Sequence, residues 1–448
     1  MDHAAPALRP LAAERSPWLR GTLRVSGDKS ISHRALMLGA MARGETIIEG
    51  LLEGEDVLAT GRAMRALGAR IEKRAGRWHV MGIGVGGFLE PEHDLDFGNS
   101  GTGLGLTMGL LGCYQFTSRF TGDALLSSRT MQHVLDPLRT VGVEVVERYD
   151  NKLPVSLRGP RTPVPIECRL PVVSAQVKGC VLLAGLVIPG TTVVVEPVMT
   201  CDHTERMLEA FGARIETRID DAGQYTVEIE GLPNLRAQQL TVPGDPSSAA
   251  YGIVAALTVP GSELVMENIL INPTRTGLID TLLEMGGDIE FMNGHISGGE
   301  HVADLRVRHS ELRGVTVPAE RTSSMIDEYP ALAVAAAFAQ GETLMHGLGE
   351  FRAKGGDRLA AVARGLRVNG VNCEEGPETL LVRGSGRVKG GGRVATLMDH
   401  SLAMSFLVMG MAADEAVTID DQTTIATRFP DFTTRFEDIG ASFIRYTD

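Results

Sequence analysis

A short pattern recurs six times along the chain and limits its possible folds more than any other feature. Each copy is an amphipathic helical segment that ends at a glycine and is followed by an alternating strand. Glycine suits this position because the residue after a helix commonly takes a left-handed backbone conformation. Copies spaced roughly seventy to eighty-five residues apart are too distant for a solenoid and indicate small α/β units. The six glycines are Gly68, Gly142, Gly212, Gly286, Gly370 and Gly440.

A second series of six segments alternates with the first. Each begins with small or polar residues and continues as an apolar helix rich in alanine and glycine, and a helix that is apolar on every side is buried. We therefore predict an α/β protein of two domains, each with three repeated units of one inner helix, one outer helix and a small sheet. The inner segments are GDKSISHRALMLGAMA, GNSGTGLGLTMGLLG, VSAQVKGCVLLAGL, GDPSSAAYGIVAAL, SSMIDEYPALAVAAAF and MDHSLAMSFLVMGM.

The polar starts of these inner segments predict an anion-binding site. Parallel inner helices would bring their N-termini together, where unpaired backbone N–H groups and the helix dipole attract negative charge. In VSGDKSISHR, Lys29 and Arg34 add full positive charges. Capping alone would explain one such start, but six copies, several with charge beyond the cap, indicate a shared site. Arg129, Arg275 and Arg358 precede outer helices at similar points of the repeat and add to the expected charge.

Composition narrows the class of ligand. The 448 residues carry a net charge of −13, which argues against nucleic-acid binding but allows a local cationic site for a small anion. The five cysteines lack metal-binding spacing, so we expect reduced thiols in a cytoplasmic protein. No apolar run is long enough to cross a membrane, and no signal-peptide core begins the chain. There is no P-loop or dinucleotide fingerprint, so neither a cofactor nor a metal is expected.

Together these motifs resemble the 5-enolpyruvylshikimate-3-phosphate (EPSP) synthase family of enolpyruvyl transferases across nearly the whole chain. The resemblance implies the enolpyruvyl transferase fold, an inside-out α/β barrel of two threefold-repeated domains with a ligand cleft between them. It places residues 1–27 and 244–448 in one domain and residues 28–243 in the other. The motifs that carry it are VSGDKSISHR, FGNSGT, SAQVK, DHTERML, GDPSSAAY, SSMIDEYP, GDRL and MDHSLAMSF.

The family joins phosphoenolpyruvate to the 5-hydroxyl of shikimate 3-phosphate and releases phosphate, so the resemblance implies two anionic small-molecule substrates. By motif, Lys29 and Asp327 would be catalytic, with Asp327 taking the 5-hydroxyl proton. The residues that would bind shikimate 3-phosphate are Lys29, Ser30, Arg34, Ser174, Ala175, Gln176 and Lys354. The residues that would lie on the phosphoenolpyruvate side are Gly101, Arg129 and Arg358.

Four positions depart from the family pattern. Gly105, Cys201 and Ser401 stand where the family or its nearest lineage has arginine, and Gly355 stands where the family has an acidic proton carrier. A positioned carboxylate is worth a factor of roughly a hundred to ten thousand in proton transfer. Serine also offers one neutral hydrogen bond where arginine offers a charged, bidentate one. We expect Cys201 to be an unreactive filler.

Three hypotheses follow. Our first is a diverged enzyme that binds shikimate 3-phosphate, no longer uses phosphoenolpyruvate, and acts as a lyase that eliminates the 3-phosphate to give a cyclohexadiene carboxylate. The second is a genuine 3-phosphoshikimate 1-carboxyvinyltransferase with substitute residues, namely Asp357 or Glu328 for the lost acid and His400 or Arg428 for the lost charge. The third is a non-catalytic ligand-binding paralogue. We favour the first because binding residues persist while the cosubstrate residues fail together.

Overall fold

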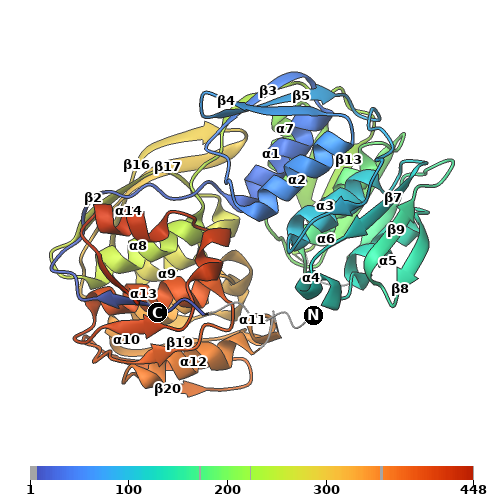
Figure 1. Cartoon of the computed structure of the whole chain (residues 1–448). Coiled ribbons are helices and arrows are strands. Elements are labelled where there is room, and N and C mark those ends of the chain that lie inside the picture. The colour runs from blue at the N-terminus through green and yellow to red at the C-terminus, as the bar shows by residue number, and fades with distance from the viewer. Residues whose placement is uncertain (1–7, 171–172, 222, 354–356, 447–448) are drawn as a thin grey trace, which may run out of the picture. The chain divides into compact units, whose positions relative to one another are not determined.

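The computed structural model describes residues 8–170, 173–221, 223–353 and 357–446. The chain divides into two compact units (Figure 1). Unit 1 comprises Met1–Ser26, Pro243–His295 and His301–Asp448, and unit 2 comprises Gly27–Val242 with Ile296–Glu300. The chain therefore leaves the first unit after its first strands and returns to it near Pro243.

The described part of unit 2 contains three four-stranded sheets. The first has the order β14 (Gln239–Thr241), β3 (Arg43–Glu49), β5 (Arg77–Ile83) and β4 (Arg70–Arg74). The second has the order β6 (Leu95–Asp96), β7 (Thr117–Thr121), β9 (Lys152–Arg158) and β8 (Glu144–Tyr149). The third has the order β10 (Glu167–Arg169), β11 (Thr191–Glu196), β13 (Tyr225–Glu230) and β12 (Ile215–Ile219).

Unit 1 also has three four-stranded sheets among its described residues. The first has the order β16 (Asp288–Ser297), β17 (Glu300–Arg308), β15 (Glu263–Leu270) and β2 (Arg20–Thr22). The second has the order β18 (Thr316–Val317), β19 (Gln340–Met345), β21 (Leu380–Ser385) and β20 (Asn372–Glu375). The third has the order β22 (Arg393–Val394), β23 (Val417–Ile419), β1 (Leu11–Glu14) and β24 (Ser442–Arg445).

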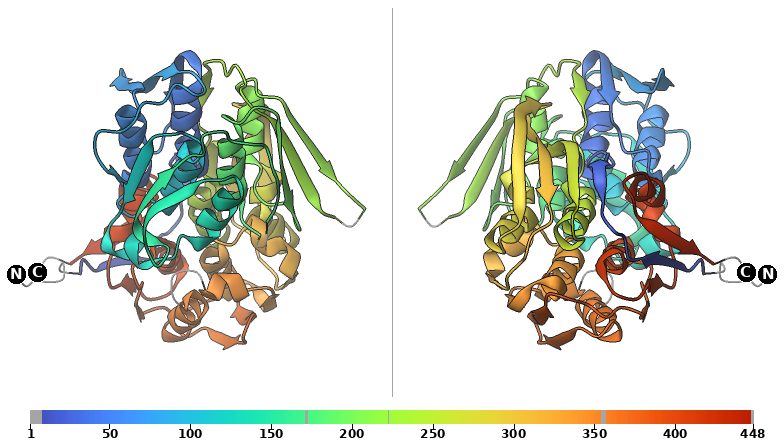
Figure 2. Two further views of the ribbon diagram at one scale, coloured as in Figure 1. Left: turned by 90° about the vertical axis from the view of Figure 1, so that its right-hand side faces the viewer. Right: turned by 90° about the vertical axis from the view of Figure 1, so that its left-hand side faces the viewer.

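The sheets share one pairing pattern. In each, an edge strand runs parallel to its neighbour, as β14 does to β3 and β18 does to β19. Antiparallel pairs follow, as between β3 and β5. The N-terminal strand β1 completes the last sheet, where it pairs with both β23 and β24 (Figure 2). The first and last segments of the chain are thus joined in one sheet of unit 1.

Each unit packs its buried helices at its centre. Unit 2 has the inner helices α1 (Lys29–Met41), α3 (Gly101–Leu111) and α6 (Ala175–Gly185), with α2 (Glu55–Ala66), α4 (Ala124–Ser128), α5 (Gln132–Thr140) and α7 (His203–Ala210) around them. Helices α3 and α6 pack closely because Gly109 has no side chain. A Cβ there would lie 2.2 Å from the Cys180 carbonyl oxygen.

The helices of unit 1 follow the same plan. Its inner helices are α8 (Pro246–Thr258), α10 (Tyr329–Phe338) and α13 (His400–Ala412), and they form the centre of the hydrophobic core (Figure 1). Around them lie α9 (Gly277–Glu284), α11 (Gly349–Ala353), α12 (Arg358–Val368) and α14 (Phe432–Asp438). The described residues of this unit also form the short 3-10 helices η1 (Pro273–Arg275), η2 (Ala319–Ser324) and η3 (Thr423–Thr427).

The structure confirms the glycine pattern read from the sequence. All six repeated glycines have a positive φ, between 81° at Gly370 and 110° at Gly440. This is the left-handed region that a glycine directly after a helix was expected to occupy. The repeat is therefore a repeat of backbone geometry as well as of residue type.

Capping accounts for part of the polar character at the inner-helix starts. Side-chain oxygens of the N-cap residues accept hydrogen bonds from first-turn amides at five of the six inner helices. The N-cap residues are Asp28, Ser100, Ser174, Asp245 and Asp399. At α10 the N-cap residue Glu328 makes no such bond, although its carboxyl is buried. Capping leaves the lysine and arginines near these starts unexplained.

Candidate active site

The start of α1 places two cations in unit 2. Lys29 is the first residue of the helix and forms an ion pair with Asp56 of α2. One turn later Arg34 is buried, and its Nε donates to the Thr204 hydroxyl at 2.8 Å while Nη1 donates to the Ser30 carbonyl at 3.0 Å. Burial lowers the pKa of Arg34, and nearby carboxylates partly oppose that shift. A buried guanidinium held in this way is preorganised to bind an anion.

The starts of α3 and α6 meet beside this helix. The Gln176 amide donates to the Gly101 carbonyl at 2.8 Å. A Cβ on Gly101 would lie 3.9 Å from Nη1 of Arg129, so this exposed arginine reaches the start of α3. Ser174 caps α6, and Ala175 is its first residue. The structure thus brings the residues predicted on these two segments into one region of unit 2.

The position of Gly105 is filled by a neighbouring side chain. A Cβ added at Gly105 would lie only 2.3 Å from Nε2 of Gln176. Any larger residue there requires the Gln176 amide, which donates to the Gly101 carbonyl, to move. The departure from the family pattern at Gly105 and the observed position of Gln176 are therefore coupled.

A buried charge cluster fixes the loop that precedes α7. Lys178 has no exposed surface, and its Nζ lies 2.8 Å from carboxylate oxygens of both Glu196 and Glu205. Glu196 also accepts from the Thr200 backbone N–H and hydroxyl, at 2.9 and 2.7 Å. The two carboxylates outweigh the effect of burial and raise the pKa of Lys178. The cluster ties α6, β11 and α7 together and so positions Thr204 beside Arg34.

A second buried pair lies next to this loop in unit 2. Nδ1 of His203 is 2.6 Å from Oε1 of Glu300. Burial alone would lower the pKa of His203, but hydrogen bonds with Cys201 and Glu300 outweigh it and raise the pKa to about 10. His203 is therefore an imidazolium at neutral pH. Cys201 is half-buried and belongs to this hydrogen-bonded group.

In unit 1, Asp327 lies between two arginines. Nη1 of Arg358 is 3.5 Å from Oδ1 of Asp327, and Nη1 of Arg428 is 4.0 Å from Oδ2. Nε of Arg358 donates to Asp399 at 2.6 Å, and its guanidinium stacks over the Phe351 ring at 4.7 Å. Burial would lower the pKa of Arg358, but Asp399 and Asp327 outweigh it and raise that pKa. Both arginines are therefore charged at any physiological pH.

Further carboxylates surround this group. Asp245 is buried and lies 3.3 Å from Nη2 of Arg275 and 2.9 Å from Nη2 of Arg428. Glu328 is buried and accepts a hydrogen bond from the Ser247 hydroxyl. Burial raises the pKa of Glu328, and this favours its neutral form. Ser401, at the start of α13, is buried and hydrogen-bonded to Tyr251.

Several partners in these groups escaped the sequence analysis. Asp56 and Glu300 stand on segments whose residue pattern gives no functional signal, and the DHTERML motif predicts no role for its residues Thr204 and Glu205. Only the fold places these four side chains beside cations. Asp245 and Asp399 do lie within motifs, but there the sequence indicates only that they cap helices. The predicted residues Lys354 and Gly355 lie outside the described residues. Asp357, weighed as a substitute acid, caps α12 and pairs with Arg352 at 2.6 Å.

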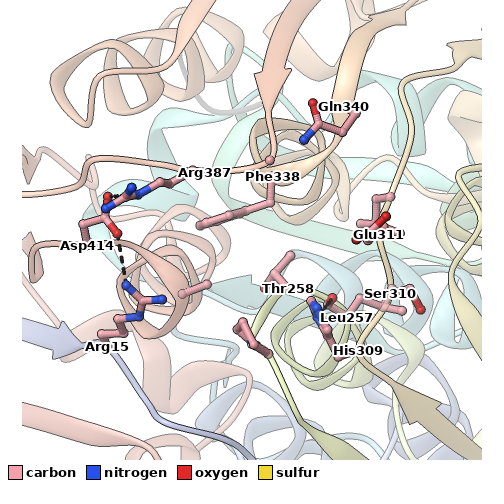
Figure 3. A pocket seen from close by; sticks show the side chains of 14 residues that line it. Arg15, Leu257, Thr258, His309, Ser310, Glu311, Phe338, Gln340, Arg387 and Asp414 are labelled. Atoms are coloured by element: carbon pink, nitrogen blue, oxygen red, sulfur yellow. Dashed lines mark hydrogen bonds and ion pairs between the residues drawn. The ribbon is translucent and has the colours of Figure 1, made fainter.

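A hollow of about 560 Å³ in unit 1 lies elsewhere (Figure 3). Thr258, Phe338 and Ala412, at the C-terminal ends of α8, α10 and α13, line it. None of the predicted site residues that the structure describes does so; in unit 1, Asp327 and Ser401 stand near the opposite, N-terminal starts of α10 and α13. The charged N-terminal ends, and not this hollow, are the candidate site of unit 1.

The described residues contain neither a membrane-spanning helix nor a metal-binding cluster. No helix there is long and apolar enough to span a membrane. Within the same residues, no group of three or more histidine, cysteine, aspartate or glutamate side chains is arranged to hold a metal ion.

Comparison with known proteins identifies the class. The model of the family EPSP synthase (3-phosphoshikimate 1-carboxyvinyltransferase) matches residues 14–436. A Chelativorans sp. protein named 3-phosphoshikimate 1-carboxyvinyltransferase is 58% identical over 444 residues, covering 98% of this chain and 99% of the relative. A Brucella canis protein of the same name is 56% identical over 443 residues and 98% of each chain.

Solved structures agree with the sequence comparisons. An EPSP synthase from Acinetobacter baumannii superposes with a TM-score of 0.90 at 38% identity, covering 98% of this chain and all of that one. The enolpyruvyl transferase NikO from Streptomyces tendae shares the fold, with a TM-score of 0.76 at 20% identity. The predicted α/β enolpyruvyl transferase fold is confirmed. The chain belongs to the EPSP synthase family, a family of enzymes.

Our first functional hypothesis is wrong. It predicted a lyase that eliminates phosphate and no longer uses phosphoenolpyruvate, whereas relatives 56–58% identical over nearly the whole chain are named 3-phosphoshikimate 1-carboxyvinyltransferase. The hypothesis took the joint loss of the cosubstrate residues as loss of the cosubstrate itself. An anion site depends on the total charge that the fold gathers at one place, and unit 1 gathers Arg275, Arg358 and Arg428 around its carboxylates.

Proposed function

We propose that the protein is a 3-phosphoshikimate 1-carboxyvinyltransferase, the second of the three hypotheses. The observation that carries the proposal is the 58% identity to a relative of that name over 98% of the chain. In this reaction the 5-hydroxyl oxygen of shikimate 3-phosphate bonds to C2 of phosphoenolpyruvate while C3 is protonated. Loss of a proton from C3 then expels phosphate, so that an enolpyruvyl ether and free phosphate result.

The cations of unit 2 support binding of shikimate 3-phosphate. Arg34 would bind the carboxylate, since its guanidinium is fixed by Thr204 and by the Ser30 carbonyl. Lys29 would exchange its ion pair with Asp56 for a ligand contact. The 3-phosphate would meet Ser174, Ala175 and Gln176 at the start of α6, where backbone N–H groups favour an anion. Lys354, outside the described residues, would complete that contact.

By the family's motifs, Lys29 and Asp327 would be the catalytic residues. Asp327 would take the 5-hydroxyl proton, because its carboxylate is held near Arg358 and Arg428 and remains a third exposed. Of the two carboxyls weighed as replacements for the acid lost at Gly355, Glu328 suits proton donation better than Asp357. Its buried carboxyl has a raised pKa, whereas Asp357 is engaged as a helix cap and with Arg352.

We also propose that units 1 and 2 are the two domains expected from the sequence, residues 1–27 with 244–448 and residues 28–243. Separate hydrophobic cores and separate sets of sheets support this. A cytoplasmic location is part of the same proposal. Buried thiols at Cys113, Cys168, Cys180 and Cys373 that form no disulfide suit a reducing compartment.

Phosphorus and proton NMR of the purified protein with shikimate 3-phosphate, with and without phosphoenolpyruvate, tests the function. We expect phosphate release and new enolpyruvyl ether signals only when both substrates are present. Asp327→Asn should lower the rate at least about a hundredfold, whereas Asp431→Asn, at an exposed carboxylate on the start of α14, should not change it. Phosphate release from shikimate 3-phosphate alone, or no turnover with both substrates, would refute the proposal.

A further inference from the structure

Arg428 reaches the starts of two inner helices of unit 1 although it follows a short 3-10 helix in a loop. Its Nη2 lies 2.9 and 3.1 Å from the two carboxylate oxygens of Asp245, the N-cap residue of α8. Its Nη1 lies 4.0 Å from Asp327, just before α10. The side chain is only 11% exposed. The fold therefore buries a full positive charge beside the carboxylate to which we assign the proton-accepting role.

Arg358 and Arg428 each contact the N-cap aspartate of an inner helix. Asp399 uses one oxygen to cap α13 and the other to hold Nε of Arg358. Asp245 caps α8 through the Ser247 N–H at 2.8 Å, and its two carboxylate oxygens lie 2.9 and 3.1 Å from Nη2 of Arg428. Each arginine is thus anchored from behind by an N-cap aspartate and directs Nη1 toward Asp327. Two anchored guanidinium groups that face one point form a preorganised anion site.

Neutralising Asp245 does not explain Arg428. Arg275 already lies 3.3 Å from the same carboxylate, so one arginine would suffice for its charge. Nε of Arg428 is buried and has no hydrogen-bond partner among the described residues, a situation that costs stability. Arg428 is therefore a second cation that is held at a cost in stability, and it adds positive charge to the site beyond what neutralises Asp245.

We propose that Arg428 is the second arginine of the anion site to which Arg358 belongs, and that it binds phosphoenolpyruvate. It would supply the charge that the family has at the position of Ser401, where a hydroxyl held by Tyr251 offers none. The inference rests on the proposed function, since phosphoenolpyruvate is its ligand. It explains how a chain with serine at that position retains a site for a multiply charged anion.

The test is the initial rate as a function of phosphoenolpyruvate at saturating shikimate 3-phosphate, with calorimetric titration of shikimate 3-phosphate alone. Arg428→Gln should raise the KM for phosphoenolpyruvate about tenfold or more, because one charge-assisted contact is lost. Arg428→Lys should lie between that variant and the wild type. The Kd for shikimate 3-phosphate should change by less than about threefold in both. Arg435→Gln is the matched control, since Arg435 is exposed on α14 and pairs with Asp431 at 3.5 Å.

The outcomes separate this inference from the proposed function. A KM for phosphoenolpyruvate in Arg428→Gln that equals the wild-type value would overturn the inference alone. Equal losses of affinity for both ligands, together with a lower melting temperature, would show a purely structural role and would also overturn it. Wild-type protein that binds shikimate 3-phosphate but no phosphoenolpyruvate would overturn the proposed function, and this inference with it.

Discussion

Replacing Lys178 by methionine tests the buried cluster that supports the shikimate 3-phosphate side. The change keeps the apolar stem but removes the cation that lies 2.8 Å from both Glu196 and Glu205. All three side chains are at most 5% exposed, so the carboxylates cannot recover hydration in place. Removing one partner from a buried ion pair typically costs about 3–5 kcal/mol. At about 2–4 °C per kcal/mol for a unit of this size, the melting temperature should fall by roughly 6–20 °C.

The pH dependence of this loss identifies its cause. Burial already raises the pKa of Glu205, and loss of Lys178 raises it further. The loss of unfolding free energy in Lys178→Met is then small at a pH where the carboxylates are protonated, and it grows as the pH rises. The difference in stability between the variant and the wild type should therefore be larger at pH 8 than at pH 5. Affinity for shikimate 3-phosphate should also fall, because the cluster positions Thr204 beside Arg34.

Thermal and urea unfolding at several pH values, with calorimetric titration of shikimate 3-phosphate, measure these effects. Lys73→Met is the control, because Lys73 and its partner Glu53 are each 43% exposed. An exposed pair of this kind contributes about 1 kcal/mol or less. A loss in Lys178→Met no larger than that of the control, or one independent of pH, would refute the reasoning.

Two further predictions concern unit 2. The raised pKa of His203, about 10, contributes stability that is complete below its ordinary value of 6.5 and is lost as the pH rises toward 10. Urea midpoints of the wild type should therefore fall between pH 7 and pH 10, whereas those of His203→Asn should be lower throughout and flatter; parallel curves would contradict this. Gly105→Ala should displace Gln176 and lower the affinity for shikimate 3-phosphate. Gln176→Ala should lower it equally, and additive losses in the double variant would show that the two positions act independently.

Much of the fold could be predicted from the sequence because its signals are local. A glycine after each outer helix and a largely apolar, buried inner helix are properties of short segments, and both were found where expected. The site could be predicted where motif and helix start coincide, as at Lys29 and Arg34 on α1. The functional error came from the same local reasoning, since Ser401 was judged without its surroundings.

The sequence by itself determined the repeated α/β units, their buried helices and the cationic character of the helix starts, because hydrophobic periodicity and capping act over a few residues. Only the tertiary structure decided which charges meet. Arg428 and Asp245 are 183 positions apart in sequence, and Arg34 and Thr204 are 170 apart. The sequence does not show which guanidinium a carboxylate will contact, because their attraction depends on separation and burial in space.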